Sequence, residues 1–309
     1  MSPTLTVHTV PGAGAEDVVV ATHGPHAGDV FTGTEDGLIW QVSPDGVRIR
    51  RVADTGGRPL GIEFAADGRL LVCDAHRGLL WIDVDSGAVE IIATGVNGIP
   101  MRFCNNAAIA VDGTIWFSDS SRRHSIQEWK ADFIRVTRTG RLLRLEPDGE
   151  PQVIVDDLAF ANGVALSADE SFVAVAETGA RCVTRHHLVD DRAGTTDTFV
   201  GDLPGYPDNI SRGSDGLIWV TIASPLDPML ERLFTLPLLV RRAVTRIPDR
   251  LQPAPKESVR VQAFDDDGEL VHDLDVPALG YHMVTGVREH EGRVWLGSLH
   301  EPAIAVLDL

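Results

Sequence analysis

A short polar turn, Asp-Gly or a close substitute, recurs along this chain and always precedes an apolar segment. The five copies are Asp67-Gly68, Asp112-Gly113, Asp169-Glu170, Asp215-Gly216 and Glu291-Gly292. Each turn joins a short apolar run to a second run rich in β-branched and aromatic residues, as in GIEFAADGRLLVCDA and AAIAVDGTIWFSDSS. This pattern predicts a series of antiparallel β-hairpins.

The hairpins belong to a longer repeat. A third strand-like run often follows, in GLLWIDV, GRLLRLEP, SVRVQAF and AIAVLDL, and a sixth hairpin, DVVVATHGPHAGDVFTGTEDGLIWQV, opens the series with extra residues in its turn. Repeats of about 40–50 residues with several strands each are typical of propeller blades. We therefore predict an all-β fold, a six-bladed β-propeller in which residues 1–309 form a single domain. A β-sandwich or two smaller β domains is the alternative.

Two insertions interrupt the repeat, residues 119–139 in the third blade and residues 225–257 in the fifth. The second predicts a helix between Pro237 and Pro248, with a shorter helical segment at Met229–Phe234 before it. Its apolar face holds Leu238, Leu239, Ala243, Val244 and Ile247, and its other face holds Arg241, Arg242, Thr245 and Arg246. Three interpretations stay open: a lid over the active-site face, a helix packed on the propeller side, and shallow attachment to a membrane surface.

Charge and composition narrow the function classes. A net charge of −18 argues against binding to nucleic acid, whose phosphates would be repelled. The chain has no apolar run of about 20 residues, and its first residues lack a basic flank and an apolar core, so we expect no transmembrane span and no signal peptide. Three unpaired cysteines without zinc-site spacing suggest reduced thiols and a cytoplasmic protein. A strand at Leu5–Val10 that closes the last blade would favour a monomer or a small homo-oligomer.

One position of the repeat carries oxygen ligands. Seven residues before the five turns, the chain has Leu60, Asn105, Asn162, Asp208 and Val284, and Glu16 takes the same position in the first repeat. The first strand of each blade lines the central channel, so these positions converge at one end of it. Four of the six hold a carboxylate or a carboxamide, the ligands that a hard cation needs, and no His or Cys ring points to zinc.

Several motifs carry a family resemblance. MRFCNNAAIAVDGTIWFSDSS (101–121), FANGVALSADESFVAVAETGA (160–180) and LPGYPDNISRGSDGLIWV (203–220) resemble strictosidine synthase-like proteins, which belong with the gluconolactonase/regucalcin and paraoxonase groups of six-bladed propellers. The resemblance implies one Ca²⁺ at the top of the channel, with Mg²⁺, Mn²⁺ or Zn²⁺ as other ions. The implied ligands are Glu16, Asn105, Asn162 and Asp208, with Asn209 as a further candidate.

The resemblance also suggests catalytic residues. In the hydrolytic relatives the aspartate ligand doubles as general base, which implies that role for Asp208. Arg102 corresponds to an arginine that holds a substrate oxygen in gluconolactonases, although the register there is one residue longer. His282 and, in the third-blade insertion, His124 lie near the expected channel entrance, and either is a candidate proton shuttle.

Two departures from the related families restrict the reaction. Leu60 occupies the position of the paraoxonases' catalytic histidine, and Thr285 that of the glutamate of strictosidine synthases. An uncharged Thr285 cannot perform that deprotonation, so a Pictet–Spengler condensation is not expected. The chain also lacks a GxSxG motif, a Walker loop and a dinucleotide fingerprint.

The favoured function is therefore metal-dependent hydrolysis of a small-molecule lactone or ester, because a bound cation would polarise the carbonyl and stabilise an oxyanion. Leu60 and the helical insertion suggest a substrate less polar than a free sugar lactone. The alternatives are a non-catalytic ligand-binding propeller with a structural metal, and a non-hydrolytic biosynthetic lyase, isomerase or condensing enzyme.

Overall fold

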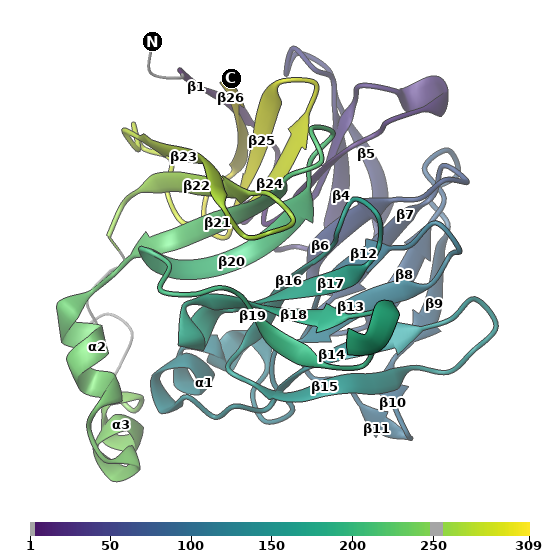
Figure 1. The fold of residues 1–309 in the computed structure, drawn as a ribbon. Helices are drawn as coiled ribbons and strands as arrows, with labels where there is room; N and C mark the ends of the chain where they lie inside the picture. The colour runs from purple at the N-terminus through teal and green to yellow at the C-terminus, as the bar shows by residue number, and fades with distance from the viewer. Residues whose placement is uncertain (1–3, 248–255) are drawn as a thin grey trace.

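Antiparallel hairpins form at all six repeats and extend into four-stranded sheets arranged around a central axis (Figure 1). The computed structural model describes residues 4–247 and 256–309. It confirms the predicted six-bladed β-propeller, including the third strands inferred from the sequence. The inner strands are buried on both faces between neighbouring blades, with burial that is nearly continuous along each strand.

The blades follow one another in chain order. The first holds β2 (Val18–Val20), β3 (Val30–Gly33), β4 (Leu38–Val42) and β5 (Ile49–Asp54), and the second β6 (Pro59–Phe64), β7 (Leu70–Asp74), β8 (Gly78–Ile82) and β9 (Val89–Ala93). The third holds β12 (Cys104–Ile109), β13 (Ile115–Asp119), β14 (Gly140–Leu145) and β15 (Gln152–Leu158), and the fourth β16 (Ala161–Leu166), β17 (Phe172–Glu177), β18 (Cys182–His187) and β19 (Thr196–Val200). The fifth holds β20 (Gly205–Arg212), β21 (Ile218–Pro225), β22 (Val259–Phe264) and β23 (Leu270–Val276).

The sixth blade closes the ring with both ends of the chain. It contains β24 (Val284–His290), β25 (Arg293–Ser298) and β26 (Ala303–Asp308), and its outer strand is β1 (Leu5–Thr9). Leu5 pairs with Leu307 and Thr9 with Ala303, so the predicted pairing of the N-terminal strand with the last blade is confirmed. A small hairpin of β10 (Gly95–Val96) and β11 (Ile99–Pro100) connects the second and third blades.

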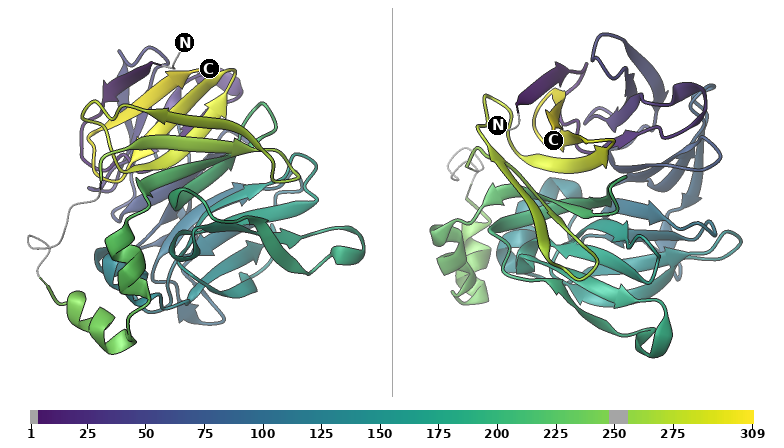
Figure 2. Two further views of the ribbon diagram at one scale, coloured as in Figure 1. Left: turned by 60° about the vertical axis from the view of Figure 1, so that its left-hand side comes forward. Right: turned by 45° about the horizontal axis from the view of Figure 1, so that its top comes forward.

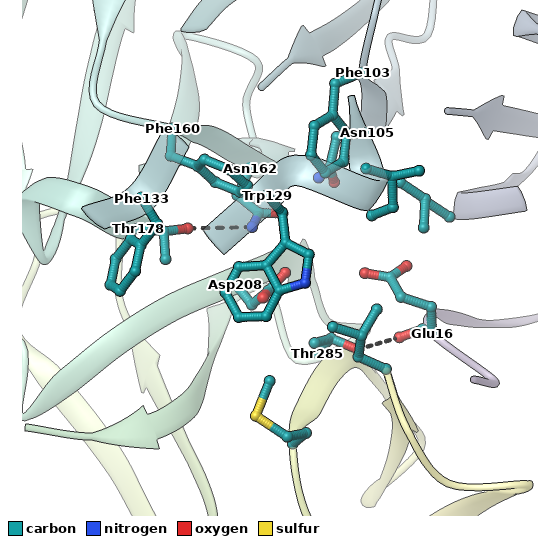
Figure 3. Close-up of a pocket in the computed structure, with 14 residues that line it drawn as sticks. Glu16, Phe103, Asn105, Trp129, Phe133, Phe160, Asn162, Thr178, Asp208 and Thr285 are labelled. Carbon is teal, nitrogen blue, oxygen red and sulfur yellow. Dashed lines mark hydrogen bonds between the residues drawn. The ribbon is translucent and has the colours of Figure 1, made fainter. Parts of the chain in front are cut away.

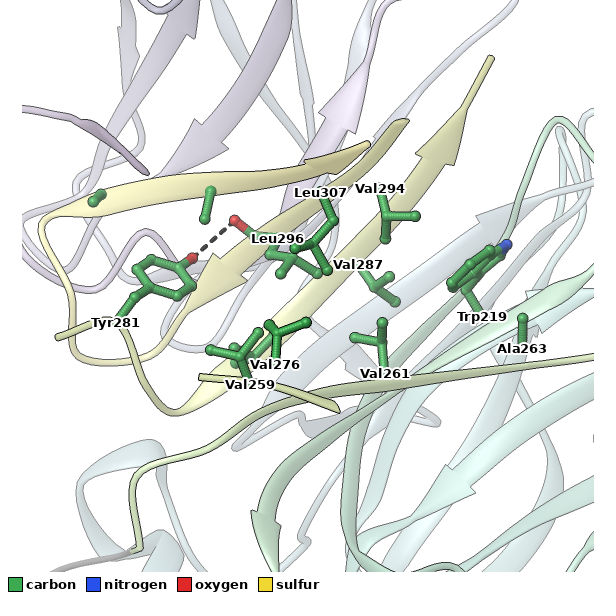
Figure 4. Close-up of a cluster of buried hydrophobic side chains, with 13 residues drawn as sticks. Trp219, Val259, Val261, Ala263, Val276, Tyr281, Val287, Val294, Leu296 and Leu307 are labelled. Atoms are coloured by element: carbon green, nitrogen blue, oxygen red, sulfur yellow. Dashed lines mark hydrogen bonds between the residues drawn. The ribbon is translucent and has the colours of Figure 1, made fainter. Parts of the chain in front are cut away.

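Apolar side chains fill the spaces between adjacent blades. Between the fifth and sixth blades, Trp219 and Val261 pack with Val287 and Leu296, all nearly inaccessible to solvent (Figure 4). Tyr281 lies in the same cluster and donates its hydroxyl to the carbonyl oxygen of Leu296 at 2.9 Å, which satisfies its one polar atom. Each large apolar side chain buried in this way contributes about 1.5–3 kcal/mol to stability. The same packing fixes the angle between blades and so positions their inner ends.

Within residues 4–247 and 256–309, three short α-helices and four 3₁₀ turns lie outside the blade sheets. The α-helices are α1 (Trp129–Arg135), α2 (Pro228–Phe234) and α3 (Leu238–Val244), and the 3₁₀ turns are η1 (Gly24–His26), η2 (Ile126–Glu128), η3 (Thr178–Ala180) and η4 (Asp190–Arg192). Asp227 caps α2 by accepting the amide of Met229 at 2.8 Å. Both helices predicted in the fifth-blade insertion are therefore present, while Pro248, expected to end the second, lies outside the described residues. Among the described residues, no helix is long and apolar enough to cross a bilayer.

Candidate metal centre and pocket

A two-residue bulge near the start of the inner strand positions the site residues. The register of the inner hairpin shifts between Pro59 and Ile62, and it shifts in the same way in the four blades that follow. A bulge leaves its residues out of the ladder and redirects their side chains. The first bulged residues are Leu60, Asn105, Asn162, Asp208 and Thr285, and Glu16 precedes β2 at the corresponding point.

The sixth blade departs from the sequence prediction by one residue. Counting back seven residues selects Val284, but Val284 pairs with Ser298 and the bulge begins at Thr285. The cause is the turn: Glu291 and Gly292 both have positive φ and form a two-residue turn between His290 and Arg293. The other repeats have longer turns, so the fixed offset fails only here.

With Thr285 in place of Val284, the side chains at this position of all six blades line one pocket at the end of the channel (Figure 3). Its polar floor is formed by Glu16, Asn105, Asn162, Asp208, Thr178 and Thr285. Its walls are apolar: Leu60, Phe103, Ile126, Trp129, Phe133, Phe160, Met283 and Leu299. The cavity itself has a volume of about 50 Å³ and lies in a hollow of about 450 Å³ that includes open solvent.

The floor and the residues beneath it hold side-chain oxygen atoms that have no hydrogen-bond donor among the described residues. Within the described part of the chain, Glu16 Oε2, Asn105 Oδ1, Asn162 Oδ1 and Asn209 Oδ1 are buried and have no hydrogen-bond partner. The amide nitrogens of two of these asparagines are engaged: Asn162 donates to Thr178 Oγ1 at 3.1 Å, and Asn209 donates to Glu16 Oε1 at 3.2 Å. Four orphaned buried acceptors in one place are costly unless a cation binds them. The residues thus fit the predicted oxygen-ligated ion.

The raised pKa values of two carboxyl groups at the floor also favour a bound cation. Desolvation, then the charges of Asp17 and Asp208, raises the pKa of Glu16 well above its usual value. Desolvation at the pocket floor likewise raises the pKa of Asp208 to about 8. A divalent cation would remove both penalties by favouring the ionised forms. Among the described residues, no cluster of three or more His, Cys, Asp or Glu side chains could hold a metal, so an ion here would depend on the asparagines too.

A second set of polar residues lies directly beneath the floor. The second bulged positions alternate between polar residues and glycine around the ring, in the order Asp17, Gly61, Asn106, Gly163, Asn209 and Gly286. Each glycine packs against the backbone of the next polar residue, and a β-carbon there would come within 2.0–2.8 Å of it or its neighbour.

Hydrogen bonds from this set tie the blades together. Asp17 accepts the amide of Ile62 and the side-chain amide of Asn106, both at 3.1 Å, and Asn106 accepts the amide of Val164 at 2.9 Å. Asp17 and Asn106 are site-supporting residues that the sequence analysis missed. Their signal was present as the alternation of Gly with Asp or Asn immediately after the oxygen-bearing position.

Buried acids also fix the backbone that enters each inner strand. Asp74, Asp119 and Glu177 each end the second strand of a blade. They accept backbone amides from Arg58, Phe103 and Ala159, respectively, at 3.0, 3.0 and 2.7 Å. The sequence signal was an acid at the same point of three repeats, in VCD, FSD and VAE.

The third-blade insertion covers the pocket, and the described part of the fifth-blade insertion does not. Ile126, Trp129 and Phe133 from η2 and α1 line it, whereas none of residues 225–247 does so. Helices α2 and α3 pack behind α1, and Phe133 makes an edge-to-face contact with Phe234 at 5.4 Å between ring centroids. The lid interpretation therefore applies more directly to residues 119–139.

The other predicted catalytic residues lie outside the pocket lining. Arg102 is exposed to solvent. His282 Nδ1 lies 2.5 Å from Glu301 Oε1, and of the neighbours His282 and Met283 only Met283 reaches the pocket. His124 pairs with Glu128 at 3.5 Å. Roles for these side chains stay predictions.

Comparison with known proteins identifies the family. Residues 20–226 match the model of the SMP-30/gluconolactonase/LRE-like region. This chain belongs to that family. The protein is 30% identical over 288 residues to strictosidine synthase-like protein 6 of Arabidopsis thaliana, covering 92% of this chain and 76% of that one. It is 33% identical over 307 residues to the rat adipocyte plasma membrane-associated protein, covering 91% and 81%.

Solved structures share the fold of this family member. A gluconolactonase from Xanthomonas campestris superposes with a TM-score of 0.72 at 19% identity, covering 99% of this chain and 89% of that one. A calcium-binding regucalcin from Agrobacterium tumefaciens gives 0.66 at 14% identity, covering 97% and 90%. At these identities the similarity establishes the propeller architecture, and the resemblance stated from the sequence motifs is confirmed at the level of the superfamily.

Proposed function

We propose that this protein is a divalent-cation-dependent hydrolase of lactones or esters, with Ca²⁺ as the cation. The observation that carries the proposal is the group of buried, unpartnered oxygens on Glu16, Asn105 and Asn162 at the floor of an apolar pocket, together with that of Asn209 beneath it. The gluconolactonase and regucalcin among its structural neighbours support the same class of chemistry.

The floor residues would hold the ion. Two carboxylates, from Glu16 and Asp208, balance the charge of a divalent cation, and the carboxamide oxygens complete an all-oxygen set suited to Ca²⁺. When bound, the cation supplies Lewis-acid polarisation of a carbonyl and stabilises the oxyanion that develops on attack.

The protein's own residues supply the remaining functions. Asp208 lies at the floor, within the pocket lining, where its carboxylate can accept a proton from an attacking water. Asn162 donates to Thr178 and so keeps its amide plane fixed beside Asp208. Apolar walls exclude water from the substrate's alkyl or aryl part and favour a lactone ring that carries an apolar substituent.

The names of the similar proteins support a second candidate function. Neither the Arabidopsis nor the rat relative is named as a hydrolase, and Thr285 and Leu60 replace residues that act in other families of this superfamily. The alternative is a ligand-binding propeller in which the cation is structural. Both functions use the same pocket and differ only in turnover.

The experiment that separates them measures hydrolysis of lactones and aryl esters by metal-free protein, before and after addition of Ca²⁺. We expect activity only with the cation, and higher kcat/KM for lactones with an alkyl chain than for sugar lactones. Asp208→Asn should abolish turnover and remain folded, while the exposed Asp202→Asn should behave as wild type. Calcium-dependent thermal stabilisation without turnover of any compound would instead establish the structural-metal alternative.

A further inference from the structure

Exposed apolar side chains concentrate on the fifth-blade insertion. Among the described residues, nineteen large apolar side chains are exposed, and seven of them lie within residues 226–247. They are Leu226, Met229, Leu236, Leu238, Leu239, Val240 and Ile247. Leu239 and Met229 are the most exposed, at 76% and 72%. Apolar patches of this kind on a soluble domain mark contact surfaces.

The same segment is basic in an acidic protein. From Leu236 to Ile247 the chain contains three arginines and no acid, although the whole protein carries a net charge of −18. Arg242 and Arg246 are exposed beside the apolar side chains, and Arg232 is exposed on α2. A helix with leucines and arginines both facing solvent is typical of segments that lie in a lipid interface.

Helices α2 and α3 form a hairpin whose inner side is hydrogen-bonded to α1 and the fifth blade. Arg241 Nη1 donates to the carbonyl oxygen of Arg135 at 2.7 Å, and Arg135 Nη2 donates to Thr245 Oγ1 at 2.7 Å. Glu231 accepts a hydrogen bond from the hydroxyl of Tyr206 at 2.9 Å. Because the inner side is bonded to α1 and the fifth blade, the exposed leucines belong to an ordered outer surface.

The position of the hairpin relates this surface to the pocket. Helices α2 and α3 project from the rim of the propeller, with α3 farthest out (Figures 1 and 2). Helix α1, against which they pack, supplies Trp129 and Phe133 to the pocket wall. A surface bound by α3 would therefore lie near the pocket.

We propose that residues 226–247 dock this protein onto an anionic lipid surface, with Leu239 and Met229 entering the interface and Arg242 and Arg246 contacting lipid phosphates. Charge decides the occupant: a second copy bound through the same surface would place like-charged arginines against each other, whereas anionic headgroups neutralise them. This inference stands apart from the proposed reaction, since it requires neither turnover nor a bound cation.

The test measures partition of the full chain onto sedimented vesicles of phosphatidylcholine alone or mixed with phosphatidylserine, in metal-free buffer. We expect binding to the mixed vesicles and weak binding to the neutral ones. Leu239→Glu should abolish binding, and Arg242→Gln and Arg246→Gln should each weaken binding to the mixed vesicles about fivefold. Val47→Glu, at an apolar residue 78% exposed on the first blade, is the matched control and should bind as wild type.

Other outcomes overturn the proposal. Absence of wild-type binding to phosphatidylserine vesicles at low salt would exclude a lipid surface. Equal loss of binding in Leu239→Glu and Val47→Glu would show non-specific adsorption. Light scattering that finds a dimer in the wild type and a monomer in Leu239→Glu would assign the surface to a second copy. Circular dichroism of each variant verifies that the fold is retained.

Discussion

Gly163 in the fourth blade lies directly against Asn209 in the fifth. A β-carbon on Gly163 would be 2.5 Å from Asn209 Cα and 2.0 Å from the amide nitrogen of Ile210. The contact sets the distance between two blades at the height of the proposed metal ligands, and the equivalent contacts of Gly61 with Asn106 and of Gly286 with Asp17 repeat it around the ring.

We expect Gly163→Ala to destabilise the protein and to widen the metal centre. The methyl group has no space, so the two blades must separate, at a cost of about 1–3 kcal/mol or more. Gly201→Ala is the control, because a β-carbon there meets only Thr198 Cγ2 at 3.7 Å. Urea denaturation measures both, and equal stability of the two variants would contradict the role assigned to the contact.

Removal of one carboxamide should weaken cation binding. In Asn162→Ala the buried Oδ1 is lost from the floor, and we expect the Kd for Ca²⁺, measured by calorimetry, to rise about tenfold or more. Asn97→Gly is the control, since Asn97 lies in a turn with positive φ between β10 and β11. An unchanged Kd in Asn162→Ala would exclude that residue as a ligand.

The metal-free protein should lose stability as the pH rises. Desolvation raises the pKa of Asp208 from 3.8 to about 8, so the protonated carboxyl stabilises the folded state fully below about pH 4. That contribution disappears as the pH increases toward 8. The Tm of the wild type should therefore fall relative to that of Asp208→Asn across this range, and saturating Ca²⁺ should remove the fall. A Tm difference independent of pH in metal-free protein would refute this assignment.

The repeat made the fold and most of the floor predictable. A constant spacing between the polar turn and the channel end holds wherever the hairpin turn has the same length, so Asn105, Asn162 and Asp208 could be identified before the structure. Glu16 could be identified from its place at the start of the first repeat. In the sixth blade the fixed spacing selected Val284 instead of Thr285. The turn at Glu291-Gly292 is shorter than the others, and the sequence of this pair did not indicate its length.

The residues that form the pocket walls were harder to predict from the sequence. The insertion at 225–257 has the stronger helical pattern, and a lid was one of the three interpretations left open for it, yet η2 and α1 of residues 119–139 line the pocket. Which insertion folds over the channel depends on the direction in which its flanking strands end, and periodicity carries no information on that direction. Phe160 and Met283 likewise reach the pocket from loops with positive φ, which the sequence did not indicate.

The last prediction concerns the buried pair of Asp119 and Arg141. Their side chains are almost inaccessible, and Arg141 donates two hydrogen bonds to Asp119 Oδ2, at 3.0 and 2.8 Å. Asp119 also accepts the amide of Phe103, two residues before Asn105, so it links the third blade's core to the proposed metal centre.

Asp119→Ala leaves Arg141 buried without its partner, and we expect a loss of about 3–5 kcal/mol in the free energy of unfolding. The control is Asp197→Ala, which removes the contacts of the partly exposed Asp197 with Arg185 and His187; solvent screening limits the loss to about 1 kcal/mol for each contact. Urea denaturation gives both values. Because Asp119 also fixes the backbone leading to Asn105, Asp119→Ala should lower the affinity for Ca²⁺ in the fraction that stays folded, whereas Asp197→Ala should leave it unchanged. Calcium affinity equal in the two variants would show that the pair stabilises the blade without positioning the ligand.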